Sequence, residues 1–502
     1  MADIRKEKNG RVYLAQAEKP PLDWKRIIFI LLGLFLFLIV YFSPDWAPAV
    51  DPSGKEFPLT QEAKAAIGLF LLAAVWWIFE VVPIGITSIM IGVTQALFLI
   101  REPREVFTDF MDPSVWFIFA SIVIGIAFAK TGLTKRMAYK MLTFVGERTS
   151  MIYLGAFGMV ACLTLIMAHT AVAAATFPLL MTIYSLYDQE GKVSKFGKGL
   201  FIGMAFVAGA GSIITLLGAA RGAVALSFFK SITGNEIGFF ELSYYMLPVG
   251  LIMIVLIWAF MMIMFKPEHS RIPGLKDKVQ MLSDKLGGLS KNEIMTILIV
   301  LVAIIILSLM SFVPELKSLN KSGVLLITTI SFFVFKILGI KDLEDVPWNI
   351  ILLFGGAMCI GFCLWKTGAA DWLAVNWLKL FQDASWFVFV IGTAFFVLMM
   401  TNLIMNVAAI AIIMPVALAT CQYLGVAPEV IIFSCLVTAG MPFIFLIGAA
   451  PNAIAYESRQ FTSGEFLKAG IPMSIILMVV LAVFVWFIWP IMGMPVLINS
   501  GG

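Results

Sequence analysis

Apolar runs long enough to cross a lipid bilayer recur along this chain, and they restrict its fold more than any other feature. A helix needs about 20 apolar residues to span the hydrocarbon core. Only 13% of the 502 residues are charged and 61% are hydrophobic, whereas a soluble domain carries about 25% charge. We therefore exclude a water-soluble enzyme and predict an all-α, multi-pass membrane protein. Nine runs read as simple spans, near 27–43, 63–82, 84–100, 115–130, 245–265, 293–313, 322–340, 348–365 and 472–492.

Four further apolar stretches do not fit a single straight helix. Two of them, 150–187 and 386–424, contain a proline and a polar cluster. At about 1.5 Å per residue each is too long for one span, so we predict hairpins that enter and leave by the same face. The other two, 200–232 and 428–456, carry Gly-rich interruptions and predict spanning helices broken at mid-membrane. The total is eleven spans and two re-entrant hairpins.

The basic residues indicate an orientation. With the N-terminus in the cytoplasm, 25 of the 35 Lys and Arg residues fall in inward segments and 9 in outward ones. The positive-inside rule requires this bias, so we expect a protein of the cell membrane with a cytoplasmic N-terminus. Arg221 is left over and falls inside an apolar region. An arginine there costs roughly 2.5–3.5 kcal/mol on insertion scales and usually faces a cavity.

The two halves of the chain repeat one another. Three short motifs recur in the same order, 230 to 237 residues apart: 130–132 with 366–368, 169–171 with 406–408, and 218–221 with 448–451. Each unit contains five crossings, an odd number, so the second copy is inverted relative to the first. Inverted repeats with broken helices are typical of secondary transporters, which hold their substrate where the breaks meet.

At these motifs the chain resembles a known family. Residues 76–83, 451–454 and 464–472, together with the two hairpins, are similar to the divalent anion:sodium symporter family of INDY-type carboxylate transporters. The resemblance implies binding of Na⁺ and a di- or tricarboxylate, a homodimer, and an elevator mechanism. It also implies Ser-Asn-Thr at each hairpin tip and a Gly-Thr-Pro-Pro-Asn-like turn in each broken helix.

The resemblance also divides the chain into scaffold and transport parts. The expected segments are a cytoplasmic segment 1–26, scaffold helices 27–149, the first hairpin and broken helix 150–232, connecting and scaffold helices 245–365, the second hairpin and broken helix 386–458, and the last helix 472–492.

The chain departs from the family motifs where ligands are expected. The tips read Ala-His-Thr at 168–170 and Met-Asn-Val at 405–407. The turns read Ala-Ala-Arg-Gly at 219–222 and Ala-Ala-Pro-Asn at 449–452. Matching these positions to the family motifs gives the candidate substrate-binding residues: His169, Thr170, Ala219, Arg221, Gly222, Asn406, Val407, Ala450, Pro451 and Asn452.

These departures favour one transport mode over another. Na⁺ prefers oxygen ligands, and the tips have lost several hydroxyls. Arg221 and His169 instead supply fixed positive charge for a carboxylate. Because a fixed cation cannot leave an empty carrier, we expect Na⁺-independent exchange of dicarboxylates such as C4 acids and 2-oxoglutarate. The alternative is a Na⁺-coupled di- or tricarboxylate symporter that uses backbone carbonyls with Asn406, Asn452 and Thr170.

Structural roles for the same residues stay open. Arg221 could snorkel from a helix end, His169 could pack as a neutral ring, and Thr170 and Asn406 could cap half-helices. Proton coupling would leave only His169 to titrate in the site. No phosphate-binding loop, nucleophile constellation or metal-ligand spacing occurs in the sequence. We therefore expect no enzyme activity, no cofactor and no nucleic-acid partner, only a carboxylate and the bilayer.

Overall fold

The computed structural model describes residues 23–51, 54–187, 193–316, 318–378 and 384–498. Within these ranges the regular structure is helical except for one antiparallel two-stranded ribbon, β1 (Ala49–Val50) and β2 (Glu56–Phe57). Ten of the described helices are long and apolar enough to cross a membrane. The predicted all-α membrane fold is confirmed. The N-terminal segment 1–26 lies almost entirely outside the described residues.

Each of the nine simple spans corresponds to a helix. The helices are α1 (Trp24–Tyr41), α2 (Gln61–Ile78), α3 (Ile84–Leu97), α5 (Pro113–Thr131), α11 (Phe239–Met264), α13 (Lys291–Leu309), α14 (Lys321–Val334), α16 (Trp348–Lys366) and α22 (Ser463–Val483). A short π-helical segment, Phe484–Ile488, continues the last of these into α23 (Trp489–Ile491).

The four irregular stretches also form as expected. The hairpins are α7 (Thr149–Thr164) with α8 (His169–Tyr187), and α18 (Trp386–Leu403) with α19 (Asn406–Leu424). The broken helices are α9 (Lys195–Ser212) with α10 (Ala220–Thr233), and α20 (Pro428–Gly440) with α21 (Ala450–Tyr456), the second break containing the 3-10 turn Leu446–Gly448. The polar clusters and glycines therefore marked real interruptions of the apolar helices.

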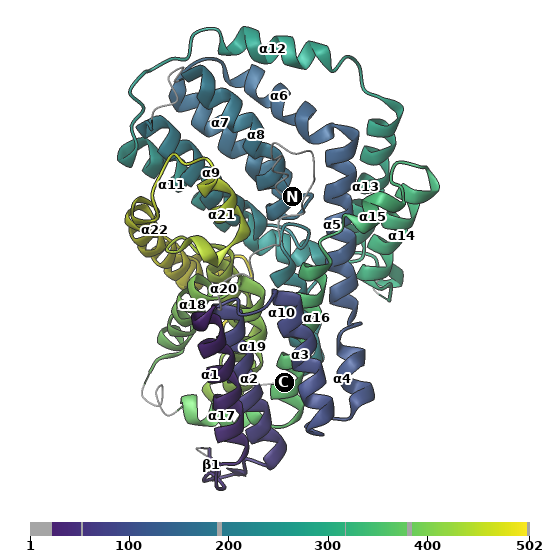
Figure 1. Cartoon of the computed structure of the whole chain (residues 1–502), viewed down its shortest axis with the longest axis vertical. Helices are drawn as coiled ribbons and strands as arrows, with labels where there is room; N and C mark the ends of the chain where they lie inside the picture. Colours follow the sequence, from purple (N-terminus) through teal and green to yellow (C-terminus); the bar gives the residue numbers. More distant parts are fainter. Residues whose placement is uncertain (1–22, 52–53, 188–192, 317, 379–383, 499–502) are drawn as a thin grey trace, which may run out of the picture.

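Several short helices were not expected from the sequence. They are α4 (Pro103–Asp109), α6 (Leu133–Val145), α12 (Leu275–Lys285), α15 (Ile340–Glu344), α17 (Ala369–Leu378) and the 3-10 turn Pro314–Leu316. Both α6 and α12 mix charged and apolar residues, so neither appears in a search for spans. They pack against each other, and Figure 1 shows α12 lying across the top of the molecule above α6.

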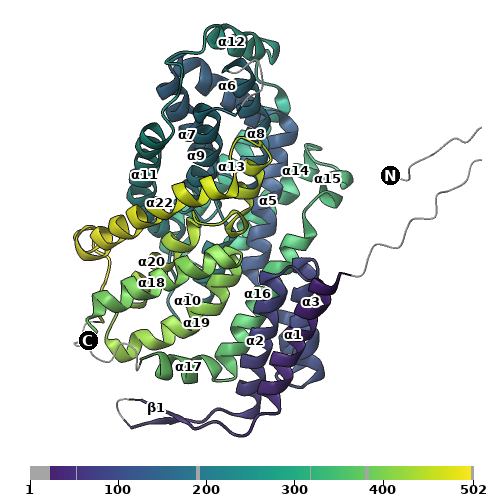
Figure 2. The ribbon, with the colours of Figure 1, turned by 60° about the vertical axis from the view of Figure 1, so that its left-hand side comes forward.

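The hairpins of the two repeats lie in opposite halves of the molecule, and the two repeats contact each other. In Figure 1 the first hairpin and α9 lie in the upper half, and α17 to α20 lie in the lower half. Figure 2 shows β1 and α17 together at the lower end. The second arm of each hairpin packs against the second half of the other repeat's broken helix, α8 against α21 and α19 against α10. The breaks of the two repeats are thereby brought together.

Candidate functional site

The two broken helices stop and restart with the same backbone geometry. Ala219 and Ala449, which precede α10 and α21, are both extended, with φ/ψ of −163°/144° and −154°/147°. Each follows a glycine that allows a close backbone approach. A Cβ on Gly218 would lie 2.7 Å from the carbonyl oxygens of Ser212 and Thr164. On Gly448 it would lie 2.6 Å from Pro442 Cβ and 3.0 Å from the carbonyl oxygen of Thr401. The repeat seen in the sequence is therefore also a repeat in structure.

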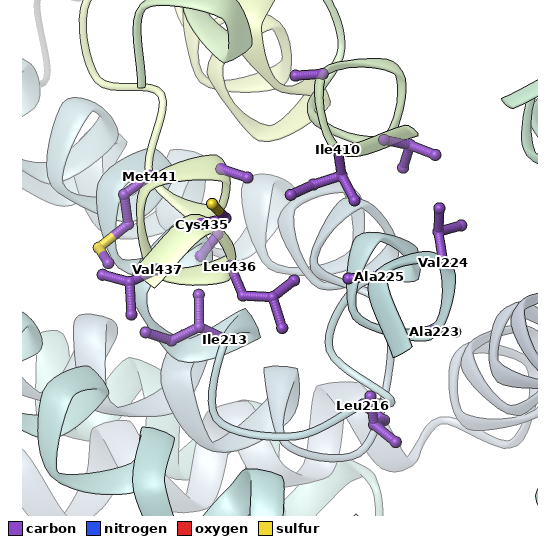
Figure 3. Close-up of a cluster of buried hydrophobic side chains, with 14 of the residues drawn as sticks. Ile213, Leu216, Ala223, Val224, Ala225, Ile410, Cys435, Leu436, Val437 and Met441 are labelled. Carbon is purple, nitrogen blue, oxygen red and sulfur yellow. The ribbon is translucent and has the colours of Figure 1, made fainter. Parts of the chain in front are cut away.

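The breaks of the two repeats meet in an apolar core. A Cβ on Gly209, near the end of α9, would lie 2.7 Å from the carbonyl oxygen of Gly440, the last residue of α20. Figure 3 shows Ile213 beside Val437 and Met441 at this junction, with buried side chains of α10 and α19 nearby. This packing fixes the C-terminal ends of α9 and α20 against each other.

Arg221 lies at this junction and is almost completely buried, with 2% of the residue exposed. Its Nη2 donates to Ser212 Oγ at 2.7 Å, and a Cβ on Gly440 would lie 2.8 Å from the same nitrogen. Its Nη1 is buried and finds no hydrogen-bond partner among the described residues. The guanidinium therefore lies beside the C-terminal ends of α9 and α20, where the helix dipoles favour a cation.

Arg221 differs from the other buried basic residues. Lys64 and Arg101 are also buried, although the charge pattern placed both in outward segments. Lys64 pairs with Asp45 at 3.3 Å, and Arg101 pairs with Asp109 at 2.6 Å. Within the described part of the chain Arg221 alone of these three has no acidic partner. A buried charge without a counter-ion is costly, so this position calls for an anion or for negative dipoles nearby.

This burial differs from the expected cavity-facing arginine. The guanidinium that was expected to supply positive charge to a carboxylate is turned toward Ser212 and the end of α20. In this conformation the guanidinium supplies positive potential from inside the protein.

The first hairpin tip is tied to the first break by backbone contacts. The His169 amide donates to the Gly218 carbonyl at 2.9 Å, and its Nδ1 lies 3.2 Å from the same oxygen. Thr215 Oγ1 donates to the carbonyl of Leu165 at 2.8 Å. Thr170 is half-buried, and its hydroxyl makes no hydrogen bond to the described residues. The tip thus leaves one free hydroxyl beside the break.

The second hairpin is joined to the second break mainly through Asn402, which the sequence reasoning missed. Its Oδ1 accepts from the amides of Ile444 and Phe445, at 2.8 and 3.3 Å. Asn452 donates through Nδ2 to the carbonyls of Pro442 and Phe445, at 2.9 and 3.1 Å. Asn452, expected to bind substrate, therefore uses its amide donors to shape the loop.

Asn406 is the first residue of α19, and its side-chain amide is not engaged by the described residues. It is 7% exposed and makes no side-chain hydrogen bond within the described ranges. Helix α19 packs against α10, so Asn406 and Arg221 lie on neighbouring helices. The other predicted positions contribute mainly backbone: Ala219, Gly222, Val407 and Pro451 are buried and Ala450 is half-buried.

The half-helices leave their first amides without side-chain caps. None of α10, α19 and α21 has a side-chain acceptor at its N-cap. Uncapped amides and the positive end of a helix dipole favour an anion. The unwound segments 213–219 and 441–449 offer backbone carbonyls, which suit a hard cation such as Na⁺. The described residues contain no cluster of three His, Cys, Asp or Glu side chains that could hold a metal ion.

Sequence signals for the missed residues were weak. Asn402 stands four residues before Asn406, on the other arm of the hairpin, but its partners lie 42 and 43 positions away. Ser212 and Ser121 support the first break, Ser121 by donating to the Leu217 carbonyl at 2.9 Å. Isolated serines in apolar helices are too common for the sequence to single these out.

Comparisons with known proteins agree with this architecture. The model of the sodium:sulfate symporter transmembrane region matches residues 24–495. Two relatives are called sodium-dependent dicarboxylate transporter SdcS. The one from Staphylococcus saprophyticus is 22% identical over 98% of this chain and 97% of its own length. The one from Staphylococcus aureus strain MRSA252 is 24% identical over 94% and 93%.

A solved structure shares the fold. The efflux pump MtrF of Neisseria gonorrhoeae matches with a TM-score of 0.57 and 14% sequence identity, over 92% of this chain and 94% of that one. The family match covers nearly every described helix, so the chain is a membrane transporter and not an enzyme. The chain belongs to the sodium:sulfate symporter family, the divalent anion:sodium symporters that its sequence resembles.

Proposed function

We propose that this protein is a secondary transporter that moves dicarboxylates together with Na⁺ across the cell membrane by alternating access. The observation that supports this most is Arg221, a buried cation without an acidic partner beside the ends of both broken helices. The relatives named sodium-dependent dicarboxylate transporters support the same substrate class.

Sodium coupling replaces the exchange mode that the hairpin tips favoured. The relatives carry sodium dependence in their names, and they support the symport alternative over Na⁺-independent exchange. The physical reason is that the lost hydroxyls remove only side-chain oxygens. The unwound segments 213–219 and 441–449 keep backbone carbonyls, which bind Na⁺ without any particular side chain.

We further propose that the two repeats hold different cations. In the first repeat the Arg221 guanidinium lies beside the ends of α9 and α20 and takes the place of a bound ion. The corresponding position of the second repeat is Pro451, which carries no charge. Na⁺ would then bind in the second break, where Asn402 and Asn452 shape the loop. Transport would then be coupled to fewer Na⁺ ions than in a carrier that has a Na⁺ site in each repeat.

The dicarboxylate would bind between the hairpin tips. Thr170 and Asn406 have unused side-chain groups, and the uncapped starts of α10, α19 and α21 provide amides. Arg221 would supply a long-range positive potential from beneath the site. C4 acids and 2-oxoglutarate have two carboxylates, which these helix starts would bind. A cytoplasmic N-terminus, a homodimer and an elevator movement of the hairpins and broken helices against the remaining spans belong to the same proposal.

Uptake of labelled succinate into proteoliposomes tests the proposal. We expect an inward Na⁺ gradient to drive accumulation into vesicles that contain no succinate. Potassium in place of sodium should lower the initial rate by more than about tenfold, which corresponds to 1.4 kcal/mol of coupling. Uptake that requires internal succinate and is the same in sodium and potassium would instead establish the exchange mode.

A further inference from the structure

A polar cavity of about 470 Å³ lies beside the outer half of α10, outside the site described above. The first turns of α5 and α14 form its other walls, and it is open to the surface. At its inner end it reaches Leu216, in the unwound segment after α9, and Ala223, one half-turn beyond Arg221. The cavity therefore extends from the protein surface to buried residues that flank the first break.

One carboxylate is held between two lysines at the mouth of this cavity. Glu236 Oε2 lies 2.7 Å from the Nζ of Lys230 on α10, and its Oε1 lies 2.8 Å from the Nζ of Lys321 on α14. Lys321 also donates to the Ile237 carbonyl at 2.8 Å. Two ammonium groups on different helices thus converge on the two oxygens of one carboxylate. A dicarboxylate substrate presents the same chemical group.

The charges that line the cavity balance while Glu236 is in place. Besides these three residues, Asp112 is the remaining charged residue of the lining. Its carboxylate accepts from the Ser114 amide at 2.8 Å, at the start of α5, and from Ser227 Oγ at 3.3 Å. The carboxylate of Asp112 is thus already hydrogen-bonded at the N-terminal end of α5. Moving Glu236 aside would leave both lysines free to face an incoming anion.

Glu236 is placed so that it can be displaced. It lies in the non-helical link between α10 and α11, after Gly234, which has a φ of 75°. Its side chain is 42% exposed and that of Lys230 is 61% exposed. Partial burial would raise the pKa of Glu236, but the hydrogen bonds from both lysines outweigh it and the pKa is lowered. The group is a carboxylate at neutral pH. Its exposed pair with Lys230 is of the weak kind, whereas the side chain of Lys321 is only 16% exposed.

We propose that this cavity is an entry site for the dicarboxylate, in which a substrate carboxylate displaces Glu236 from Lys230 and Lys321 before the substrate moves on to the breaks. The inference rests on the proposed transport of dicarboxylates. Glu236 acts as a tethered competitor that keeps the lysines paired in the absence of substrate. Positive charge in a cleft raises the local concentration of an anion, and salt weakens the effect.

Kinetics of Na⁺-driven succinate uptake by Glu236→Gln test the entry site. The amide cannot compete as a carboxylate, so we expect KM for external succinate to fall roughly 3- to 10-fold with a smaller change in kcat. The gain should shrink as inert salt is raised. Glu315→Gln is the matched control: it removes one exposed charge from the link before α14 that neither lines the cavity nor pairs with Lys230 or Lys321.

Lys230→Ala makes the opposite change, because it removes one of the two positive charges that would bind the substrate. Lys55→Ala is its control. Lys55 lies over the ring of Phe57 in the β ribbon, outside the cavity lining. We expect KM to rise for the first variant and stay unchanged for the second. If the wild-type protein takes up succinate but Glu236→Gln matches Glu315→Gln at every salt concentration, the entry site is wrong and the proposed function stands. If the wild-type protein takes up no dicarboxylate, both are wrong.

Discussion

Arg221 is where the sequence and the structure inform each other most. The apolar surroundings of this residue were visible in the sequence, and they indicated a functional cation. What the sequence did not show is that the guanidinium is turned inward, toward Ser212 and Gly440. That direction depends on contacts between α9, α10 and α20, which lie far apart along the chain. It shifts the expected role from a direct carboxylate ligand to a permanent charge.

Substitution of Arg221 tests that role. We expect Arg221→Ala to abolish succinate uptake, because the ends of α9 and α20 then lack their cation. Arg221→Lys should retain a measurable fraction, since a permanent charge needs no bidentate fork. Initial rates in proteoliposomes, normalised to protein content, are the measurement. Wild-type uptake by the alanine variant would show that Arg221 only anchors its helix.

Ser212 is the hydrogen-bond partner of Arg221, and its loss should reduce stability. A hydrogen bond to a charged group contributes roughly 1.5–3 kcal/mol, and Ser212→Ala leaves the guanidinium further unsatisfied. We expect a lower thermal midpoint for the purified protein in detergent. Ser434→Ala is the control, because Ser434 Oγ is buried without a partner among the described residues. Equal midpoints for the two variants would contradict the assigned contact.

At the scale of elements, the spans, hairpins and breaks were predictable because each has a local signal. Long apolar runs predict spans, and a polar cluster or glycines inside a run predict a tip or a break. The charged helices α6 and α12 have no such signal, and neither does the contact between Asn402 and the loop after α20. Asn402 and its partner Ile444 are 42 residues apart in the sequence and come together only in the folded chain.

The two asparagines of the second hairpin should have separable effects. Asn402→Ala removes the acceptor for two loop amides, so we expect a weaker apparent affinity for Na⁺, by roughly tenfold for each 1.4 kcal/mol lost. Asn406→Ala removes an unused amide at the tip. It should raise KM for succinate by roughly 2- to 13-fold, the range expected for one neutral hydrogen bond. Sodium and succinate titrations of both variants measure the two constants.

A reversal of that pattern would change the assignment. If Asn402→Ala altered only the succinate constant and Asn406→Ala only the sodium constant, the loop after α20 would line the substrate site and the tip would hold the ion. The wild-type protein, titrated in the same vesicles, provides the reference for both constants.

At the scale of the whole molecule, the cross-packing of the repeats indicates which parts would move together in the proposed elevator movement. Because α8 packs against α21 and α10 packs against α19, the hairpins and broken helices hold one another. The inverted repeat predicted that these elements meet, but not which arm contacts which half-helix. Where α10 faces α14, Glu236 links Lys230 to Lys321 through side chains that are 16% to 61% exposed. The exposed pair of Lys230 and Glu236 is weak, which suits a boundary of the proposed elevator movement.

Cross-linking across this boundary should stop transport. The two lysines are bridged by Glu236 and make no direct contact, so the reagent is a short bis-maleimide that joins cysteines at 230 and 321. Cys162 is the exposed cysteine of the described chain and is first replaced by Ser. We expect the reagent to abolish uptake by Lys230→Cys/Lys321→Cys and to spare each single variant.

The control pair, Lys130→Cys/Asp342→Cys, joins α5 to the helix α15, where the native side chains lie 2.6 Å apart. Both control positions belong to the proposed scaffold, so uptake should survive there. If the 230/321 pair also retained full activity after complete cross-linking, α10 would not move against α14, and the proposed elevator boundary would have to lie elsewhere.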